Sequence, residues 1–346
     1  MEGWCVRWIG ILCCSLFPAF PQQSELANRQ IALDVVVTDK SGKPVTGLQP
    51  QDFTLLDDKQ PQKILSFDAV RGATADPPVE VVLLVDEVNS SFTNVSFARA
   101  QIEKFLKHAG AELPRPVSLA VLSDAGLALG NVTSKDGNAL AADLSQNKAV
   151  LRSITRSQGI YGANDRVGLS LSALQQIADY EAPRPGRKLV IWLSPGWPFL
   201  TGPRIDLSSK DQQQIFNNIV SISGSLRRAR ITLYSIDPLG TADSGGFRTL
   251  YYEEFLKGVK KPSQAQVGNL ALQAIAVQSG GRALNSSNDV AGEIATCMAD
   301  ANAFYVLTFY SLVGDGPNEY HSLEIKLDKS GLKALTRTGY YAQPAR

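Results

Sequence analysis

The sequence predicts an α/β fold: a doubly wound, mostly parallel sheet with a small β-sandwich beside it. Three observations predict this fold, namely apolar runs of strand length, amphipathic helical patterns between them, and alternating strands near both chain ends. Buried strands that alternate with such helices are typical of a parallel sheet covered on both faces. We expect a signal peptide (1–22), an N-terminal β segment (30–72), a central α/β domain (78–303) and a C-terminal β segment (304–346) that packs with the N-terminal one.

The central region begins with its most informative stretch, the nearly uninterrupted apolar run Val79–Val85, which ends at Asp86. Such a run indicates a strand that is buried on both faces. The residues after it lie at the carboxyl end of the strand, where ligands bind in open α/β sheets. Further buried strands are predicted at 117–122, 188–193 and 230–236, with amphipathic helices between them.

The two chain ends carry strands of a different kind. Apolar residues recur at every second position from Ile31 to Val37 and again from His321 to Leu327, and Phe304–Leu312 is a further strand. This period of two is typical of antiparallel strands with one face in a core and one in water. Neither end is long enough to fold alone, so we expect the two to form one sandwich.

Composition limits the classes of partner. The chain has 346 residues, 44% of them hydrophobic and 19% charged, with a formal net charge of +1. These values describe a globular protein with a substantial core. Acidic and basic residues are interspersed and form no basic stripe, so nucleic acid is not an expected partner. A protein partner is expected instead.

The N-terminus has the pattern of a secretory signal peptide. Arg7 precedes an apolar stretch, Trp8–Phe17, which Pro18 and a polar segment follow. The sequence therefore predicts export to the periplasm or the extracellular space, with no membrane span once the signal is removed. Of the four cysteines only Cys297 would remain, so no internal disulfide is expected.

Four motifs resemble those of a known family. They are VVVTDKSGKPVTGLQPQDFTLLDDKQPQKILSF near the start, VVLLVDEVNSS, GRKLVIWLSPGWP, and the terminal GYYA. With them the chain resembles the acidobacterial-type VWFA-related domain proteins of the von Willebrand factor type A superfamily. The resemblance covers nearly all of the chain after the signal. It implies a bacterial, secreted protein that acts in protein binding or cell adhesion.

The resemblance also implies a cation site, which this sequence carries only in part. Type A domains typically hold a divalent cation through an Asp-x-Ser-x-Ser motif, a threonine and a second aspartate. Asp86 and Ser90 match the motif, but Val88 replaces its first serine, and the second aspartate is missing. Asn89 and Asp165 are the candidate substitutes, and such a donor set predicts at most a weak Mg²⁺ or Ca²⁺ site. The alternative is a strand end followed by a helix N-cap.

The same edge supplies a candidate contact surface made of Ser91, Ser194, Trp197 and Phe199, whose rings either stand exposed or pack back on neighbouring loops. We expect an exported interaction module of the adhesion or scaffold kind, not an enzyme. One alternative is a structural envelope component without a ligand at this edge. Another is a hydrolase that uses Ser194, which would need a histidine such as His321 as its base.

Overall fold

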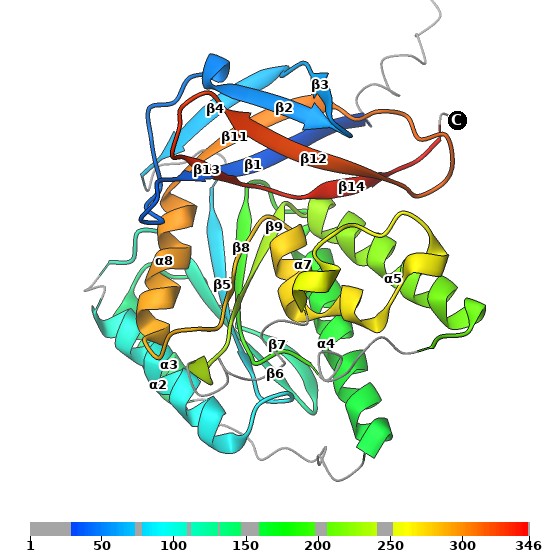
Figure 1. The fold of residues 1–346 in the computed structure, drawn as a ribbon. Helices are drawn as coiled ribbons and strands as arrows, with labels where there is room; N and C mark the ends of the chain where they lie inside the picture. The colour runs from blue at the N-terminus through cyan, green and yellow to red at the C-terminus, as the bar shows by residue number, and fades with distance from the viewer. Residues whose placement is uncertain are drawn as a thin grey trace, which may run out of the picture.

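The computed structural model describes residues 29–72, 78–108, 112–130, 132–146, 159–197, 206–240 and 252–344, with the backbone alone at 159–161. Two bodies pack together: a layered α/β domain and a β-sandwich that covers one end of it (Figure 1). This arrangement confirms the predicted fold class. The helices described include none that is long and apolar enough to cross a membrane.

The α/β domain is built on a six-stranded sheet with the order β10-β9-β8-β5-β6-β7. All neighbouring strands are parallel except β7, which runs antiparallel to β6 at one edge. Along the chain, the first strand lies in the middle and successive strands extend to either side, as in doubly wound folds. The strands are β5 (Glu80–Asp86), β6 (Val117–Ser123), β7 (Gly126–Leu129), β8 (Lys188–Leu193), β9 (Ile231–Ile236) and β10 (Ala283–Leu284).

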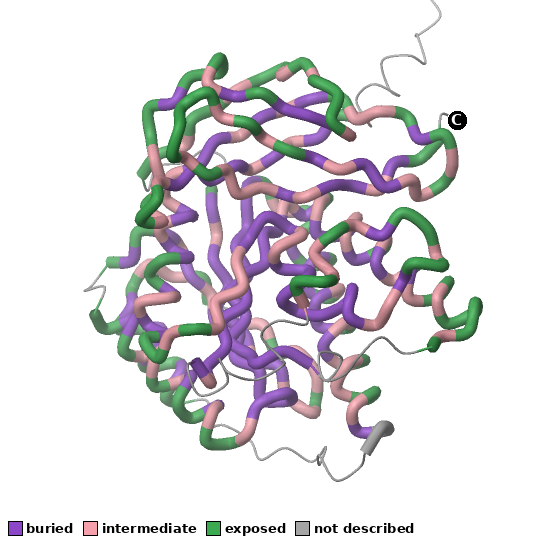
Figure 2. Tube along the Cα trace, in the orientation of Figure 1, coloured by how far each residue is buried: buried purple, intermediate pink, exposed green. Residues whose placement is uncertain are grey.

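Helices cover both faces of this sheet, which explains the unbroken apolar run of β5. Val81, Leu83 and Val85 pack under α2 (Phe92–His108), α3 (Gly137–Gln146) and α8 (Val290–Asn302). The alternate residues Val82 and Leu84 pack under α4 (Gly159–Glu181), α5 (Ser209–Arg228) and α7 (Leu272–Gln278). The strands between the two helical layers are buried almost throughout (Figure 2).

Strands from both chain ends interleave in the sandwich, in two sheets of order β13-β1-β11-β4 and β14-β12-β2-β3. β1 pairs with β11 over residues 30–35, with Leu33 opposite Leu307, and with β13 over residues 36–38. The apolar faces of the two sheets close on one core. The strands are β1 (Gln30–Thr38), β2 (Phe53–Asp57), β3 (Gln60–Gln62), β4 (Ser66–Arg71), β11 (Ala303–Tyr310), β12 (Glu319–Leu327), β13 (Lys333–Leu335) and β14 (Gly339–Ala342).

The sandwich lies at the amino ends of the parallel strands. Arg230, directly before β9, forms an ion pair with Asp34 of β1. The segment that contains the 3₁₀ turns η5 (Tyr252–Phe255), η6 (Pro262–Gln264) and η7 (Val267–Leu270) also reaches the sandwich. There a side-chain carbon on Gly258 would come within 1.9 Å of the Tyr320 ring, so only glycine fits. Asp86 and the carboxyl edge of the sheet therefore lie at the opposite end of the domain from the sandwich.

Candidate functional site

Asp86 ends β5, is 1% exposed, and has both carboxylate oxygens occupied by N–H donors of the protein. Its Oδ1 accepts hydrogen bonds from the backbone N–H groups of Val88 (3.0 Å) and Asn89 (2.8 Å). Its Oδ2 accepts from Asn89 Nδ2 (2.8 Å) and Trp192 Nε1 (3.1 Å). A carboxylate offers about four lone-pair positions, so four donors saturate it.

The neighbouring strand and helix build this network. Trp192 lies opposite Leu84 in the β5–β8 register, which brings its indole N–H beside the end of β5. Asn89 Nδ2 also donates to Ser170 Oγ of α4 at 2.9 Å, and Ser170 in turn donates to the Arg166 carbonyl. The Asp86 carboxylate thereby ties β5, β8 and, through Asn89, α4 together.

The other predicted cation ligands do not form a set of oxygen donors with Asp86. Asp165 is exposed on α4. Asn89 turns an N–H toward Asp86 and not its oxygen. Its Oδ1 and Ser90 Oγ are buried, without a hydrogen-bond partner in the part of the chain described. These two neutral oxygens are a poor site for a hard divalent cation, because the Asp86 carboxylate is already saturated.

The predicted contact residues within the described part of the chain are buried or half-buried, whereas an interaction surface needs exposed side chains. Trp197 is fully buried: its Nε1 donates to the Leu270 carbonyl at 2.8 Å, and its ring meets that of Trp192 at 5.6 Å. The expectation of an exposed Trp197 is thus corrected in favour of the packed alternative. Ser194 is also buried and accepts from Gly196 N at 3.0 Å. Ser91 is half-buried and accepts from Asn94 N at the start of α2. Phe199 lies outside the described residues.

The sequence reasoning missed an exposed aromatic residue at the same edge. Phe92, the first residue of α2, is 56% exposed. It borders a groove of about 450 Å³ between α2 and α3, which Arg99 and Leu144 also line. Arg99 bonds the Leu144 carbonyl and forms an ion pair with buried Glu87 at 3.4 Å. The signal was available, because an aromatic residue directly after a capping serine lies on the first turn of a helix.

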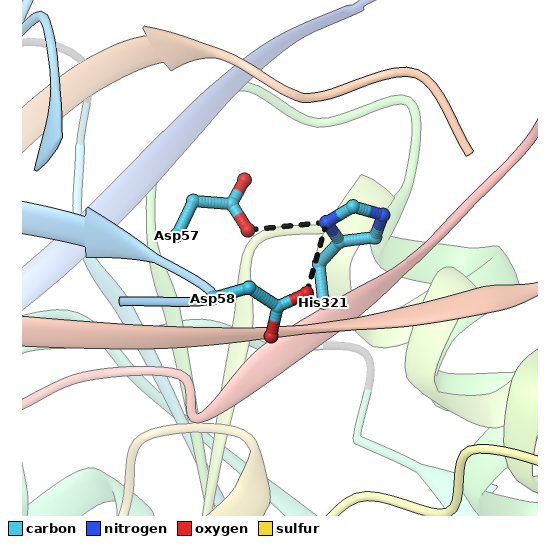
Figure 3. Close-up of side chains that lie close together, drawn as sticks. All are labelled: Asp57, Asp58 and His321. Atoms are coloured by element: carbon cyan, nitrogen blue, oxygen red, sulfur yellow. Dashed lines mark hydrogen bonds and ion pairs between the residues drawn. The ribbon is translucent and has the colours of Figure 1, made fainter. Parts of the chain in front are cut away.

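A second polar cluster, which the sequence did not predict, lies in the sandwich (Figure 3). His321 Nδ1 is 3.2 Å from Asp57 Oδ1 and 3.4 Å from Asp58 Oδ2. Tyr340 donates its hydroxyl to Asp57 Oδ2 at 2.5 Å. Burial raises the pKa of the Asp57 carboxyl above its ordinary value. The three residues Asp57, Asp58 and His321 are the group of potential metal ligands found among the described residues.

The pairing of Ser194 with a histidine, which the hydrolase alternative would need, is not formed. His321 pairs with Asp57 inside the sandwich, whereas Ser194 lies at the carboxyl edge of the parallel sheet and bonds Gly196. The other histidine, His108, is exposed at the end of α2. Neither histidine forms the hydrogen bond to Ser194 that an activated serine needs.

No protein-family model and no curated protein matches the chain. Solved structures give distant likenesses. Proximal thread matrix protein 1 from the mussel byssus is 12% identical over 71% of this chain and 51% of its own, with a TM-score of 0.38. The manganese-loaded TRAP protein of Plasmodium vivax is 10% identical over 82% of this chain and 100% of its own, with a TM-score of 0.37. The pilus adhesin SpaC of Lactobacillus rhamnosus GG, in its open conformation, is 10% identical over 86% of this chain and 49% of its own, with a TM-score of 0.38.

The chain spans about half the length of the mussel and Lactobacillus proteins. Its structural neighbours thus include a pilus adhesin and a thread matrix protein of the mussel byssus. At these identities and TM-scores the likenesses carry no argument about function, which has to come from the residues of the site.

Proposed function

We propose that this chain is an exported protein-interaction module, of the adhesion or scaffold kind, that binds its partner without a metal ion at the carboxyl edge of the parallel sheet. One observation carries the proposal. The Asp86 carboxylate is saturated by internal N–H donors, while Phe92, six residues further along the chain, stands exposed at the same edge. Export is supported by the signal-like segment 1–22.

Metal-dependent recognition needs a cation with a free coordination position for a carboxylate of the partner. Here the Trp192 and Asn89 N–H groups occupy the Asp86 oxygens that would hold the cation. To bind a cation, the protein would have to break these buried, charge-assisted hydrogen bonds, which are about twice as strong as neutral ones. A contact surface at this edge therefore depends on side-chain shape and polarity.

The groove between α2 and α3 has the chemistry of a contact surface. Exposed aromatic residues and arginine are enriched among the residues that contribute most to protein–protein affinity. Phe92 offers an apolar ring, and Arg99 lies beside it, held in place by Glu87 and the Leu144 carbonyl. A partner that inserts an apolar side chain beside Phe92 would bury area that now faces water.

One observation favours the alternative of a structural envelope component. Trp197 packs against Trp192, and Trp192 donates a hydrogen bond to Asp86. The exposed Phe92 favours interaction over that alternative. A non-enzymatic role is supported by the separation of Ser194 from both histidines.

Site-specific photo-crosslinking tests the interaction. Phe92 is replaced by p-benzoyl-phenylalanine in cells that produce the protein, with the same replacement at Tyr180 as a matched control. Tyr180 is an exposed aromatic residue on α4, and Arg184 links it to Glu80 at the amino edge of the sheet. We expect one discrete adduct from position 92 and none from position 180. Absence of an adduct at position 92, or the same adducts from both, would contradict the proposal.

Calorimetric titration of the chelator-treated protein with Mg²⁺, Mn²⁺ and Ca²⁺ tests the metal-independent part. We expect Asp86→Asn to leave any heat of binding unchanged. Millimolar or tighter binding that disappears in Asp86→Asn would overturn the metal-free assignment of this edge.

A further inference from the structure

We propose that Asp57, Asp58 and His321 form a binding site for one divalent transition-metal ion of the Zn²⁺ type, inside the terminal β-sandwich. This site is independent of the carboxyl edge and lies at the other end of the molecule. It would connect the end of β2, the turn that follows it, and β12.

The distances between the candidate ligand atoms fit a single ion. Two ligand atoms that each lie about 2.0–2.2 Å from one ion are about 3.0–3.5 Å apart in tetrahedral or octahedral geometry. His321 Nδ1 is 3.2 Å from Asp57 Oδ1 and 3.4 Å from Asp58 Oδ2. The imidazole nitrogen therefore already stands at ligand spacing from both carboxylates, which approach it from the same side (Figure 3).

Outer hydrogen bonds hold each carboxylate from behind. Asp57 Oδ2 accepts from the Tyr340 hydroxyl at 2.5 Å. Asp58 Oδ1 accepts from Ser322 N at 3.0 Å and from Ser322 Oγ at 2.8 Å. The His321 ring stacks on Tyr340, with 5.2 Å between the centroids and an angle of 13° between the planes. One oxygen of each carboxylate is thus held by these hydrogen bonds, and the other faces Nδ1. In metal sites, outer hydrogen-bond partners orient the ligands in the same way.

One nitrogen of the His321 ring has no hydrogen-bond partner among the described residues, and the other faces both carboxylates. The His321 side chain is only 7% exposed, and its Nε2 has no hydrogen-bond partner among the described residues. Nδ1 lies within hydrogen-bond distance of Asp57 Oδ1, and the tautomer decides which atom donates. In the tautomer with its proton on Nε2, the Nδ1 lone pair faces two carboxylate oxygens, and these electron-rich atoms repel one another. A cation between the three atoms removes that repulsion.

The charge of the cluster and its access to solvent also favour the binding of a cation. Asp57 is fully buried, and the carboxyl group of Asp58 lies on the same imidazole nitrogen. Buried carboxylates are costly unless they are paired or bind a metal. A divalent ion would neutralise both. The Asp58 side chain is 36% exposed, so an ion can enter there and water can fill its remaining coordination positions.

The donor set selects the class of metal. Mg²⁺ and Ca²⁺ take oxygen ligands, whereas imidazole suits Zn²⁺ and its transition-metal neighbours. For a site of two carboxylate oxygens and one imidazole nitrogen we expect Zn²⁺ to bind more tightly than Mn²⁺, and Mg²⁺ and Ca²⁺ to bind least. This order would separate the site from any weak Mg²⁺ or Ca²⁺ binding at Asp86.

The test is calorimetric titration of the chelator-treated full chain with Zn²⁺, compared with its Asp58→Asn and Asp68→Asn variants. Asn tolerates the positive φ of 45° at position 58 and still offers an oxygen to Ser322, so this variant should fold. Asp68 is exposed on β4 of the same sandwich and serves as the matched control. We expect one Zn²⁺ per chain, weakened about tenfold or more by Asp58→Asn and unchanged by Asp68→Asn.

Histidine NMR locates the ion, because the chain has two histidines and the other one, His108, is an exposed residue at the end of α2 in the α/β domain. Zn²⁺ should shift the His321 imidazole resonances at one equivalent and leave those of His108 unchanged. The proposal is overturned if the His321 resonances do not respond to Zn²⁺, or if Asp58→Asn binds Zn²⁺ as tightly as the unmodified chain. Either result would leave the cluster as a structural hydrogen bond between His321 Nδ1 and Asp57 Oδ1.

Discussion

Asp86 and Asp57 occupy equivalent positions in the two bodies of the molecule, yet their surroundings are opposite in kind. Each is the last residue of a strand and each is buried. Asp86 faces four N–H donors. Asp57 faces one hydroxyl, an imidazole nitrogen and the neighbouring carboxylate of Asp58. A buried carboxylate at the end of a strand is therefore not by itself a metal site. The number of hydrogen-bond donors around it decides whether its oxygens are available to bind a cation.

The difference has energetic consequences. A saturated carboxylate contributes its hydrogen bonds to the stability of the fold, and removing it leaves several donors unpaired. A carboxylate with fewer donors around it contributes less to the stability of the folded protein and keeps an oxygen available to bind a cation. The substitutions below separate these two cases, from the largest expected effect to the smallest.

Asp86→Ala should be the most damaging change. It removes the acceptor of four buried hydrogen bonds, and breaking a buried charged network of this kind costs about 3–5 kcal/mol. The measurement is the free energy of unfolding from urea denaturation, with Asp68→Ala on exposed β4 as control. A loss below about 1 kcal/mol would mean that the network at Asp86 is not closed as described.

Trp192→Phe should cost about 2 kcal/mol, because it removes one N–H donor to a buried carboxylate and keeps most of the ring packing. Trp197→Phe is the matched comparison, since its N–H donates to a neutral carbonyl, that of Leu270, and its loss should cost about 1 kcal/mol. Urea denaturation of both variants gives the difference. Equal losses would argue that the Asp86 carboxylate adds nothing to its bond with Trp192.

Glu293 is a third carboxyl group to set beside Asp86 and Asp57, and its charged neighbours are acidic. Burial, then the charges of Asp237 and Asp289, raise the pKa of Glu293 from 4.5 to about 7. A raised pKa favours the protonated form in the folded state, so this stabilisation is complete below pH 4.5 and is lost as the pH rises through about 7.

Glu293→Gln should therefore stabilise the protein at pH 8, by about 1 kcal/mol after allowance for solvent screening, and change little at pH 4.5. Urea denaturation of both proteins at the two pH values checks this. The expectation fails if the variant and the unmodified chain show the same dependence of stability on pH.

Asp58→Asn should have the smallest effect on the metal-free protein, about 0.5 kcal/mol or less. The amide oxygen keeps the bonds to Ser322, and asparagine suits the left-handed backbone at this turn. Thermal unfolding without and with Zn²⁺ is the measurement. In the unmodified chain Zn²⁺ should raise Tm, and in the variant the same concentration should raise it less. A large loss of stability without metal would place Asp58 with Asp86 as a structural carboxylate.

Much of the fold could be predicted because its signals are local. The run at 79–85 is apolar on both faces since helices cover both, and the period of two at 31–37 follows from the single core of the sandwich. β10 carries no comparable signal, because it has only two residues. Such elements are defined by what packs on them, and their own sequence carries little signal.

At the site, the sequence by itself determined where Asp86 lies, at the end of a buried parallel strand, and that the usual second aspartate is absent. Whether its oxygens would meet a cation or N–H donors was decided by Trp192, 106 residues away, through the register of β5 with β8. Likewise, only the pairing of β2 with β12 brings Asp57 to His321, 264 residues away. Hydrogen bonds form only when donor and acceptor are about 3 Å apart. The pairing of the strands decides which residues, distant in the sequence, come that close, and the local sequence pattern does not reveal this pairing.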